Sequence, residues 1–339
     1  MYKNFYKLSK NPFQLNADPS FFFDSSGHKR AKAYLRYGLA QGEGFVVVTG
    51  IPGTGKTMLV KELGKFLEND QSVIIGSLVS SNVGAEDTLR MLAATFAIAY
   101  ELDDGKAVLL NRIETFFKEK AKQGKRILLI VDEAQNLPNQ SIEELRMLSN
   151  YEWEGNIIFQ TFLIGQEELG KRIFAADMEQ VRQRIVATYQ LKSLNADETK
   201  EYILFRLQKA GWQGNPQFHD EAIAAVHAFS KGIPRRINTV CDRLLLYGFL
   251  EELRQIDLQA TKKVIAEIME DSQAIKAQKQ QVTTERLAGT TEANGSLEQR
   301  VAALEEAVSE LSNKLKKEQA LLRKAILIQL DMDDVYDDD

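Results

Sequence analysis

The glycine-rich segment Gly50–Thr57 constrains the fold more than any other part of the chain, and it reads GIPGTGKT. It fits the pattern G-x-x-x-x-G-K-[ST], in which backbone N–H groups surround phosphate oxygens. Residues 45–49 predict a short buried strand before the segment, and residues 58–67 predict a helix after it. Strand, glycine loop and helix are the context of a phosphate-binding P-loop. The alternative is a chance glycine-rich turn, which the Lys-Thr pair and the preceding strand disfavour.

The residues of this loop predict a site for a nucleoside triphosphate with a divalent cation. The Lys56 ammonium can reach the β- and γ-phosphates, and the Thr57 hydroxyl can bind Mg²⁺. The start of the following helix adds the positive end of its dipole. We therefore expect ATP and Mg²⁺ as the bound groups. The candidate nucleotide-binding residues are Gly50, Pro52, Gly53, Thr54, Gly55, Lys56, Thr57 and Met58.

A second motif lies where an apolar run, residues 127–131, ends in Asp132-Glu133. Such a run suits a strand that is buried on both faces of a parallel sheet. The carboxyl ends of these strands are where open α/β sheets bind ligands. Asp132 would hold Mg²⁺ through water, and Glu133 would orient and polarise the attacking water. An apolar strand followed by Asp-Glu is common by itself, so this interpretation depends on the P-loop upstream.

Strands and helices alternate up to about residue 191, which predicts an α/β fold with a parallel sheet. Further strands are expected at residues 72–77, 157–164 and 187–191, and a helix at residues 171–185. Gln166 follows one of these strands, where a polar side chain could sense the γ-phosphate. The alternative for Gln166 is an ordinary loop amide.

The chain of 339 residues predicts several domains. We expect an ATPase core at residues 1–192, a helical lid at 193–270 and a flexible linker at 271–295. A coiled coil is expected at 296–330, with a chance amphipathic helix as the alternative, and a disordered acidic tail at 331–339. The aromatic segment 1–24 would pack on the core or cover the adenine.

Composition excludes few classes of function. The net charge of −5 does not favour broad binding of nucleic acid, although a local basic patch remains compatible with it. The single cysteine allows no internal disulfide, and the three histidines, including His28, are expected as surface or half-buried helix residues without a metal. No apolar run approaches the roughly 20 residues of a membrane span. We expect a cytoplasmic protein that a partner could bring to the inner membrane.

Several motifs together resemble one family of ATPases. They are Asn11-Pro12-Phe13, Asp18-Pro19, Tyr37-Gly38-Leu39 with Gly44-Phe45, the P-loop, Val131 to Gln135, Gly165-Gln166, Arg182 to Ile185 and Gly232 to Arg235. In this order they resemble an AAA+ ATPase, and within that superfamily the ExeA/GspA-like secretion ATPases. The nearest resemblance is to the subfamily encoded beside exosortase (PEP-CTERM) and exopolysaccharide loci. It covers roughly residues 1–270.

The resemblance implies roles for three arginines. Arg235 would be the sensor-2 arginine, which reaches from the lid to the γ-phosphate. Arg184 or Arg182 would be the arginine finger that enters the site of a neighbouring subunit and stabilises the transition state. The alternative for Arg182 and Arg184 is two charges on a solvated helix face.

Three classes of function follow from these patterns. The leading hypothesis is Mg²⁺-dependent ATP hydrolysis by a homo-oligomer, such as a ring, that remodels or gates a protein partner. The resemblance places that partner in an envelope secretion or exopolysaccharide export system. The coiled coil would recruit the partner or help to assemble the ring. The alternative is an ATP-controlled DNA-binding AAA+ protein of the transposition or initiator type, although no basic domain follows the lid. A scaffold that binds ATP without hydrolysis is disfavoured, because Lys56 and Glu133 are both present.

Overall fold

A central β-sheet positions the candidate site. The structure, a computed structural model, describes residues 2–16, 18–67, 70–79, 84–271 and 273. Five parallel strands form it in the order β2-β3-β6-β1-β7. Their bounds are β1 Phe45–Gly50, β2 Val73–Val79, β3 Arg126–Asp132, β6 Phe159–Gly165 and β7 Ile185–Leu191. The predicted α/β class with a parallel sheet is thereby confirmed.

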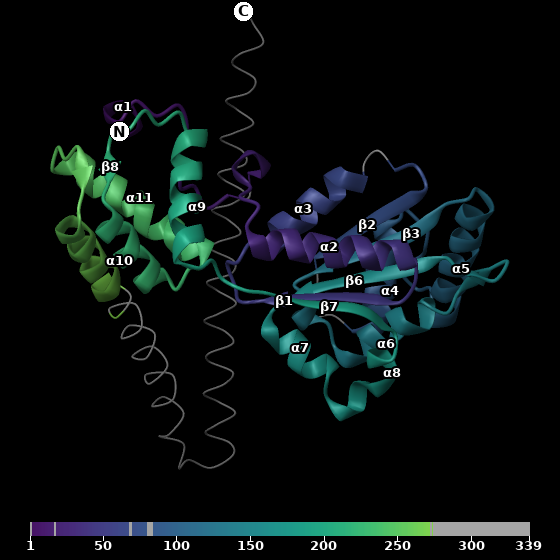
Figure 1. The fold of residues 1–339 in the computed structure, drawn as a ribbon. Helices are drawn as coiled ribbons and strands as arrows, with labels where there is room; N and C mark the ends of the chain where they lie inside the picture. Colours follow the sequence, from purple (N-terminus) through teal and green to yellow (C-terminus); the bar gives the residue numbers. More distant parts are fainter. Residues whose placement is uncertain (1, 17, 68–69, 80–83, 272, 274–339) are drawn as a thin grey trace, which may run out of the picture. The chain divides into compact units, whose positions relative to one another are not determined.

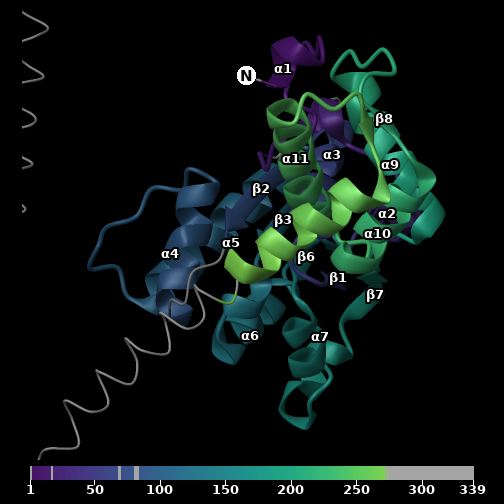
Figure 2. The ribbon, with the colours of Figure 1, turned by 90° about the vertical axis from the view of Figure 1, so that its left-hand side faces the viewer.

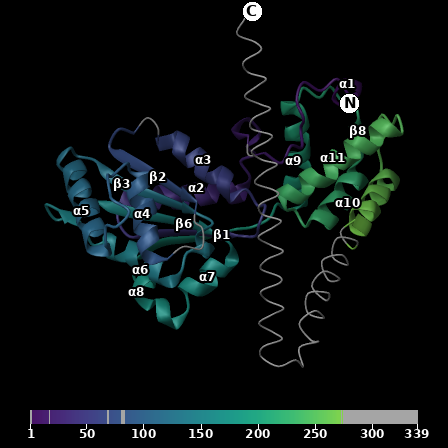
Figure 3. The ribbon, with the colours of Figure 1, turned by 180° about the vertical axis from the view of Figure 1, so that it is seen from behind.

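Helices cover both faces of this sheet, because side chains of its buried strands are apolar in both directions (Figure 1, Figure 3). On one face, α2 (Ser26–Gln41) and α3 (Lys56–Leu67) pack on Val46, Val48 and Phe162. The other face is covered by α4 (Ala85–Thr95), α5 (Lys106–Lys122), α6 (Asn139–Leu148) and α7 (Glu167–Ile173).

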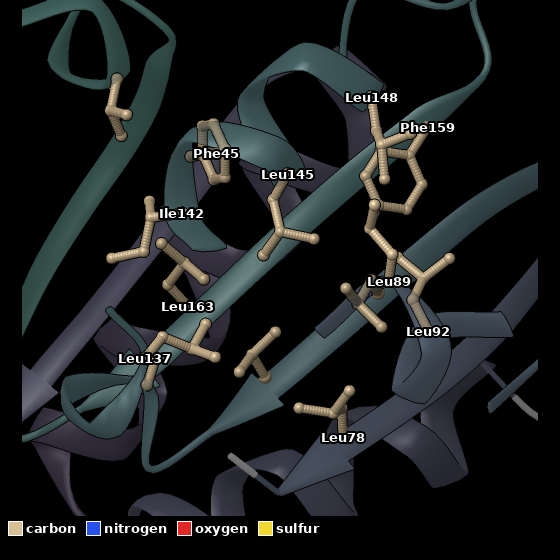
Figure 4. Close-up of a cluster of buried hydrophobic side chains, with 14 of the residues drawn as sticks. Phe45, Leu78, Leu89, Leu92, Leu137, Ile142, Leu145, Leu148, Phe159 and Leu163 are labelled. Atoms are coloured by element: carbon tan, nitrogen blue, oxygen red, sulfur yellow. The ribbon is translucent and has the colours of Figure 1, made fainter. Parts of the chain in front are cut away.

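Each face of the sheet carries a cluster of buried hydrophobic side chains, and the larger cluster lies on the face covered by α4 to α7 (Figure 4). Leu89 and Leu92 of α4 and Leu145 of α6 meet strand residues such as Leu163. All four side chains are fully or almost fully buried. Burial of a leucine side chain contributes about 1.5–3 kcal/mol, so this layer holds the strands in register.

The helices of the predicted lid lie beside one another (Figure 2), and their buried side chains form a hydrophobic cluster distinct from the two that cover the sheet. They are α9 (Ala196–Lys209), α10 (Asp220–Ser230) and α11 (Pro234–Leu250), and residues 258–271 are also helical. Two short strands, β8 (Gln217–Phe218) and β9 (Gln255–Ile256), pair in parallel beside them. A capping box starts α9. The Asn195 side chain accepts a hydrogen bond from the backbone N–H of Glu198, and the Glu198 carboxylate accepts one from the backbone N–H of Asn195.

The aromatic N-terminal segment differs from expectation in its packing. Tyr6, Phe13 and Phe21 are buried in the lid cluster, not against the sheet. The first helix, α1 (Tyr2–Phe5), contacts α11, and the Tyr2 hydroxyl donates to Asp242 at 2.5 Å. The segment therefore belongs with the lid helices, although we had assigned residues 1–24 to the core.

The helix expected at residues 171–185 is also broken. It divides into α7, the 3₁₀ turn Ala176–Met178 and α8 (Glu179–Arg182), after which β7 begins at Ile185. Tertiary contacts explain the break, because the Asp177 carboxylate accepts from Asn139 of α6 at 2.9 Å and Met178 is buried. A hairpin that we had not predicted, β4 (Glu152–Trp153) and β5 (Asn156–Ile157), follows α6.

The chain divides into two units, Met1–Ile268 and Met269–Asp339. The second unit carries the predicted linker, coiled coil and acidic tail, which lie outside the described residues apart from residues 271 and 273. These assignments and the division between residues 192 and 193 stay predictions.

Candidate nucleotide site

The P-loop lies between the end of β1 and the start of α3, as its sequence predicts. Gly53 and Gly55 have φ angles of +86° and +98°, which side chains with a Cβ rarely adopt. The buried Thr54 hydroxyl closes the loop by donating to the Ile51 carbonyl at 2.9 Å. The loop leads into the N-terminus of α3 at Lys56, and a helix N-terminus is a favourable place for an anion.

The Lys56 ammonium lies inside the loop. It donates to the carbonyls of Gly50 and Ile51, at 2.9 Å and 3.1 Å. Burial lowers the pKa of Lys56, while the carboxylates of Glu133 and Asp132 oppose that shift. The buried ammonium inside the loop places a positive charge where a phosphate group could bind.

Thr57 and Asp132 meet across the two predicted motifs. The Thr57 hydroxyl donates to Asp132 Oδ2 at 2.8 Å, and Asp132 is buried at the carboxyl end of β3. A hydroxyl and a carboxylate are hard oxygen ligands of the kind that Mg²⁺ prefers, together with waters and phosphate oxygens. The donor set therefore fits Mg²⁺ beside a nucleotide.

Glu133 occupies an unusual backbone position immediately after β3. Its φ and ψ angles are 53° and 35°, the left-handed region. Its Oε2 accepts from the side-chain amides of Gln135 and Gln166, at 2.6 Å and 3.2 Å. The Gln135 hydrogen bond is the largest influence that lowers the pKa of Glu133, with burial acting against it. The carboxylate is thus kept ionised, as a residue that polarises water requires.

Gln166 is brought to the site by the register of β6 beside β1. Gly165, the last residue of β6, lies opposite Thr49, so Gln166 lies beside Gly50 at the start of the P-loop. Its side chain contacts Glu133 as described above. The structure therefore brings Gln166 to Glu133 and the P-loop, while its role toward the γ-phosphate stays a prediction.

The lid side of the site contacts the P-loop directly. The backbone N–H of Arg235, in the first turn of α11, donates to the Gly53 carbonyl at 3.2 Å. A Cβ on Gly53 would lie 2.8 Å from Arg235 Cβ, so this approach requires glycine in the loop. The predicted sensor-2 residue therefore lies next to the phosphate loop.

A cavity of about 440 Å³ extends from these groups toward the N-terminal segment. That volume is within the range of small-molecule sites. Its walls include Met58, Phe22 and Tyr202, so rings from the N-terminal segment and from α9 lie where a base could stack. The residues that line it are Gln14, Leu15, Asn16, Asp18, Phe21, Phe22, Phe23, His28, Pro52, Gly53, Thr54, Gly55, Lys56, Thr57, Met58, Glu133, Gln166, Tyr202, Arg206, Pro234, Arg235 and Asn238.

His28 is a wall residue that sequence reasoning missed. It is 4% exposed, whereas we expected a surface or half-buried position. Its Nδ1 lies 2.7 Å from the Ser25 hydroxyl, and a Cβ on Gly55 would lie 3.0 Å from its Nε2. Burial is the main cause that lowers its pKa to about 4. The sequence signal near His28 was Ser25, which is the N-cap of α2 three residues earlier. This residue indicates where the helix begins, but it does not indicate which face of the helix is buried.

The two candidate finger arginines lie away from this cavity. Arg182 pairs with Glu179 within α8, and Arg184 Nη2 donates to Asn150 Oδ1 at 2.6 Å. The Arg184 carbonyl accepts from the N–H of Phe45, the first residue of β1. The P-loop follows the opposite end of that six-residue strand, about 17–20 Å away. Neither arginine is brought to its own nucleotide site.

A P-loop and an acidic pair on non-adjacent strands, with a third strand between them, are the arrangement of an AAA+ P-loop domain. Residues 39–173 match the family described as an AAA domain. Over 249 residues the chain is 36% identical to General secretion pathway protein A of Aeromonas hydrophila. Together these matches confirm the resemblance to the ExeA/GspA-like AAA+ proteins, while the exosortase-locus subfamily stays a prediction.

The match with that relative covers 74% of this chain but 45% of the relative's length. The chain thus spans less than half of the protein that it resembles.

Solved structures with the same fold include two archaeal proteins. ORC2 of Aeropyrum pernix aligns with a TM-score of 0.56 at 14% identity, covering 76% of this chain and 72% of its own. Cdc6p of Pyrobaculum aerophilum aligns with a TM-score of 0.57 at 11% identity, covering 75% and 69%. At these identities the likeness concerns the fold alone. Among the described residues, no helix is both long enough and apolar enough to cross a membrane.

Proposed function

We propose that the chain is an ATPase that binds ATP with Mg²⁺ and hydrolyses it to ADP and phosphate. One observation carries this proposal. The P-loop after β1 and the residues after β3 and β6 bring Lys56, Thr57, Glu133 and Gln166 to a single cavity, and Asp132 accepts a hydrogen bond from Thr57. Each of these groups has a role in phosphoryl transfer. A site that only bound nucleotide would not need a carboxylate such as Glu133 that polarises the attacking water.

The residues of the chain divide the work of this reaction. The P-loop N–H groups and Lys56 bind the phosphates, and Thr57 and Asp132 would hold Mg²⁺, directly or through water. The ion supplies neutralisation of the charge that develops on the phosphate oxygens. Glu133 orients the attacking water and accepts its proton. Arg235, from the lid, would contact the γ-phosphate and so link hydrolysis to lid movement.

We further propose that the active state is a homo-oligomer. Arg184 lies at the start of the strands, while the P-loop lies at their ends, so Arg184 could complete only the site of another copy. Arg182 already has a carboxylate partner in Glu179, whereas Arg184 donates to the neutral amide of Asn150. Arg184 is therefore the better candidate for the finger.

The output of the ATPase is proposed to be remodelling or gating of a protein in an envelope secretion or exopolysaccharide export system. The name of the Aeromonas relative supports the secretion part of this placement. We place the protein in the cytoplasm, held at the inner membrane by that partner through the coiled coil. The likeness to ORC2 and Cdc6p concerns the fold and adds no support to the DNA-binding alternative.

The test is ATP hydrolysis as a function of protein concentration, with light scattering to report oligomer size. Specific activity that rises as oligomers form would support a site completed by a neighbour. Constant activity in a monomer would remove the oligomer from the proposal, and the absence of hydrolysis at every concentration would remove the ATPase.

The finger is tested by Arg184→Ala, which should bind ATP but lose about 10³-fold of the oligomer-dependent activity. Arg182→Ala is the matched control and should retain most activity. Mixing Arg184→Ala with Glu133→Gln should restore activity, because one supplies a competent site and the other a competent finger. Mixtures as inactive as their components would contradict the assignment.

A further inference from the structure

The side chain of Gln135 forms a bridge between two elements of the proposed site. Gln135 lies in the 3₁₀ turn Ala134–Asn136, two residues after Glu133. Its Nε2 donates to Glu133 Oε2 at 2.6 Å, and its Oε1 accepts from the backbone N–H of Gln166 at 2.9 Å. Both ends of the amide are therefore engaged, one with each element.

The surrounding residues are arranged to admit this side chain. A Cβ on Gly165 would lie 2.8 Å from Gln135 Oε1 and 3.2 Å from the Gln135 backbone nitrogen. Glycine at the end of β6 thus lets the turn approach the strand. Arg172 of α7 donates to the Gln135 carbonyl at 3.1 Å and also to the Leu137 carbonyl. The turn is fixed from the side away from the cavity.

Glu133 needs such a support because its side chain is long and its backbone is in the left-handed region. A glutamate can adopt many rotamers, and a general base acts efficiently only when it is held within hydrogen-bond reach of the attacking water. Of its two amide partners, Gln135 is at 2.6 Å and Gln166 is at 3.2 Å. Gln135 provides the shorter bond and also fixes the backbone that carries the other partner.

We propose that Gln135 is a positioning residue for ATP hydrolysis, whose amide couples Glu133 to Gln166 so that both keep one arrangement at the γ-phosphate end. This inference rests on the proposed ATPase function. In this proposal Gln135 does not contact the nucleotide. A substitution of Gln135 should therefore lower kcat and leave the affinity for ATP unchanged. In the same way, a change in the γ-phosphate that moves Gln166 would be transmitted to Glu133.

The test is Gln135→Met in the full chain, since methionine has a similar length but neither donates nor accepts here. We expect kcat to fall about 100-fold, the size of effect that a misplacement of about 1 Å produces. The Kd of a non-hydrolysable ATP analogue with Mg²⁺ and the Tm should stay close to those of the parent. Gln123→Met, on an exposed residue at the end of α5, is the matched control.

A second variant separates positioning from packing. Gln135→Glu keeps an acceptor for the Gln166 N–H but places a carboxylate against Glu133, and it should lose turnover to a similar extent. Combining Gln135→Met with Gln166→Met should cost less than the product of the single effects, because both act through Glu133.

The outcomes distinguish this inference from the function on which it rests. If the parent hydrolyses ATP and Glu133→Gln does not, but Gln135→Met turns over at the parent rate, the positioning role is wrong and the ATPase stands. Equal losses of binding, Tm and turnover would also overturn it, because Gln135 would then be a structural residue. A parent chain without hydrolysis would remove both proposals.

Discussion

The two walls of the cavity are built in different ways. On one wall, Lys56 and Thr57 begin α3 after the loop that follows β1, while Glu133 and Gln166 follow the ends of β3 and β6. The P-loop and the register of the sheet together set their spacing. On the other wall, Arg206 of α9 contacts Pro12, which is 194 residues away. The strand wall depends on local sequence and one sheet, while the lid wall forms only when both ends of the unit are folded together.

This contrast predicts that substitutions on the strand wall change chemistry more than stability. Glu133→Gln should bind ATP and lose about 10³-fold of the hydrolysis rate, because the neutral amide cannot accept the proton from water. The measurement is phosphate release at saturating ATP, with analogue binding as the control. Hydrolysis at the parent rate would show that another group is the base.

Substitutions on the lid wall should change stability first. Arg206 is 6% exposed and donates to Pro12 O, the Tyr202 hydroxyl and Gln14 O, at 2.5, 2.8 and 3.3 Å. Arg206→Met leaves these acceptors without their donor and should lower the free energy of unfolding by about 3 kcal/mol.

Urea unfolding measures this effect, and Arg236→Met, on an exposed arginine of α11, is the control. We also expect weaker binding of ATP, because the N-terminal segment that lines the cavity is no longer fixed to α9. Equal stabilities of the two variants would show that the lid wall does not depend on this arginine.

His28 lies where the walls meet, and it should make stability depend on pH. Its pKa of about 4 in the folded chain lies below the usual 6.5, so the unfolded chain binds the proton more tightly. The free energy of unfolding should then fall by about 2 kcal/mol between pH 7 and pH 5 because of this group. Asp24, Lys32 and Glu198 are the charged side chains that act on it.

His28→Gln should remove this part of the pH dependence, since glutamine does not titrate. Unfolding by urea at several pH values without nucleotide provides the measurement, and His219→Gln, on an exposed residue, is the control. The same slope in the parent and in His28→Gln would place the titration elsewhere.

The strand wall was also the part that the sequence predicted best. The P-loop and Asp132-Glu133 are recognisable because an apolar strand, a turn and a helix lie within a few residues of one another. Where the determinants are local, pattern and structure agree.

The lid wall was predicted poorly because its contacts join distant residues. Nothing in the aromatic segment tells whether Tyr6 and Phe13 pack on a sheet or on helices that begin almost 190 residues later. His28 and Gln135 were missed for related reasons, since their roles depend on Gly55 and Gln166 in other elements.

The hydrogen bond from the Arg235 N–H to the Gly53 carbonyl gives α11 the mechanics of a lever. The helix has 17 residues and is therefore about 25 Å long. It is attached to the phosphate loop at its first turn, so that point would act as a fulcrum. A rotation of about 10° about the first turn would move the C-terminal end of α11 by about 4 Å. A displacement of the P-loop smaller than a bond length would thus become a larger displacement at the C-terminal end of the helix.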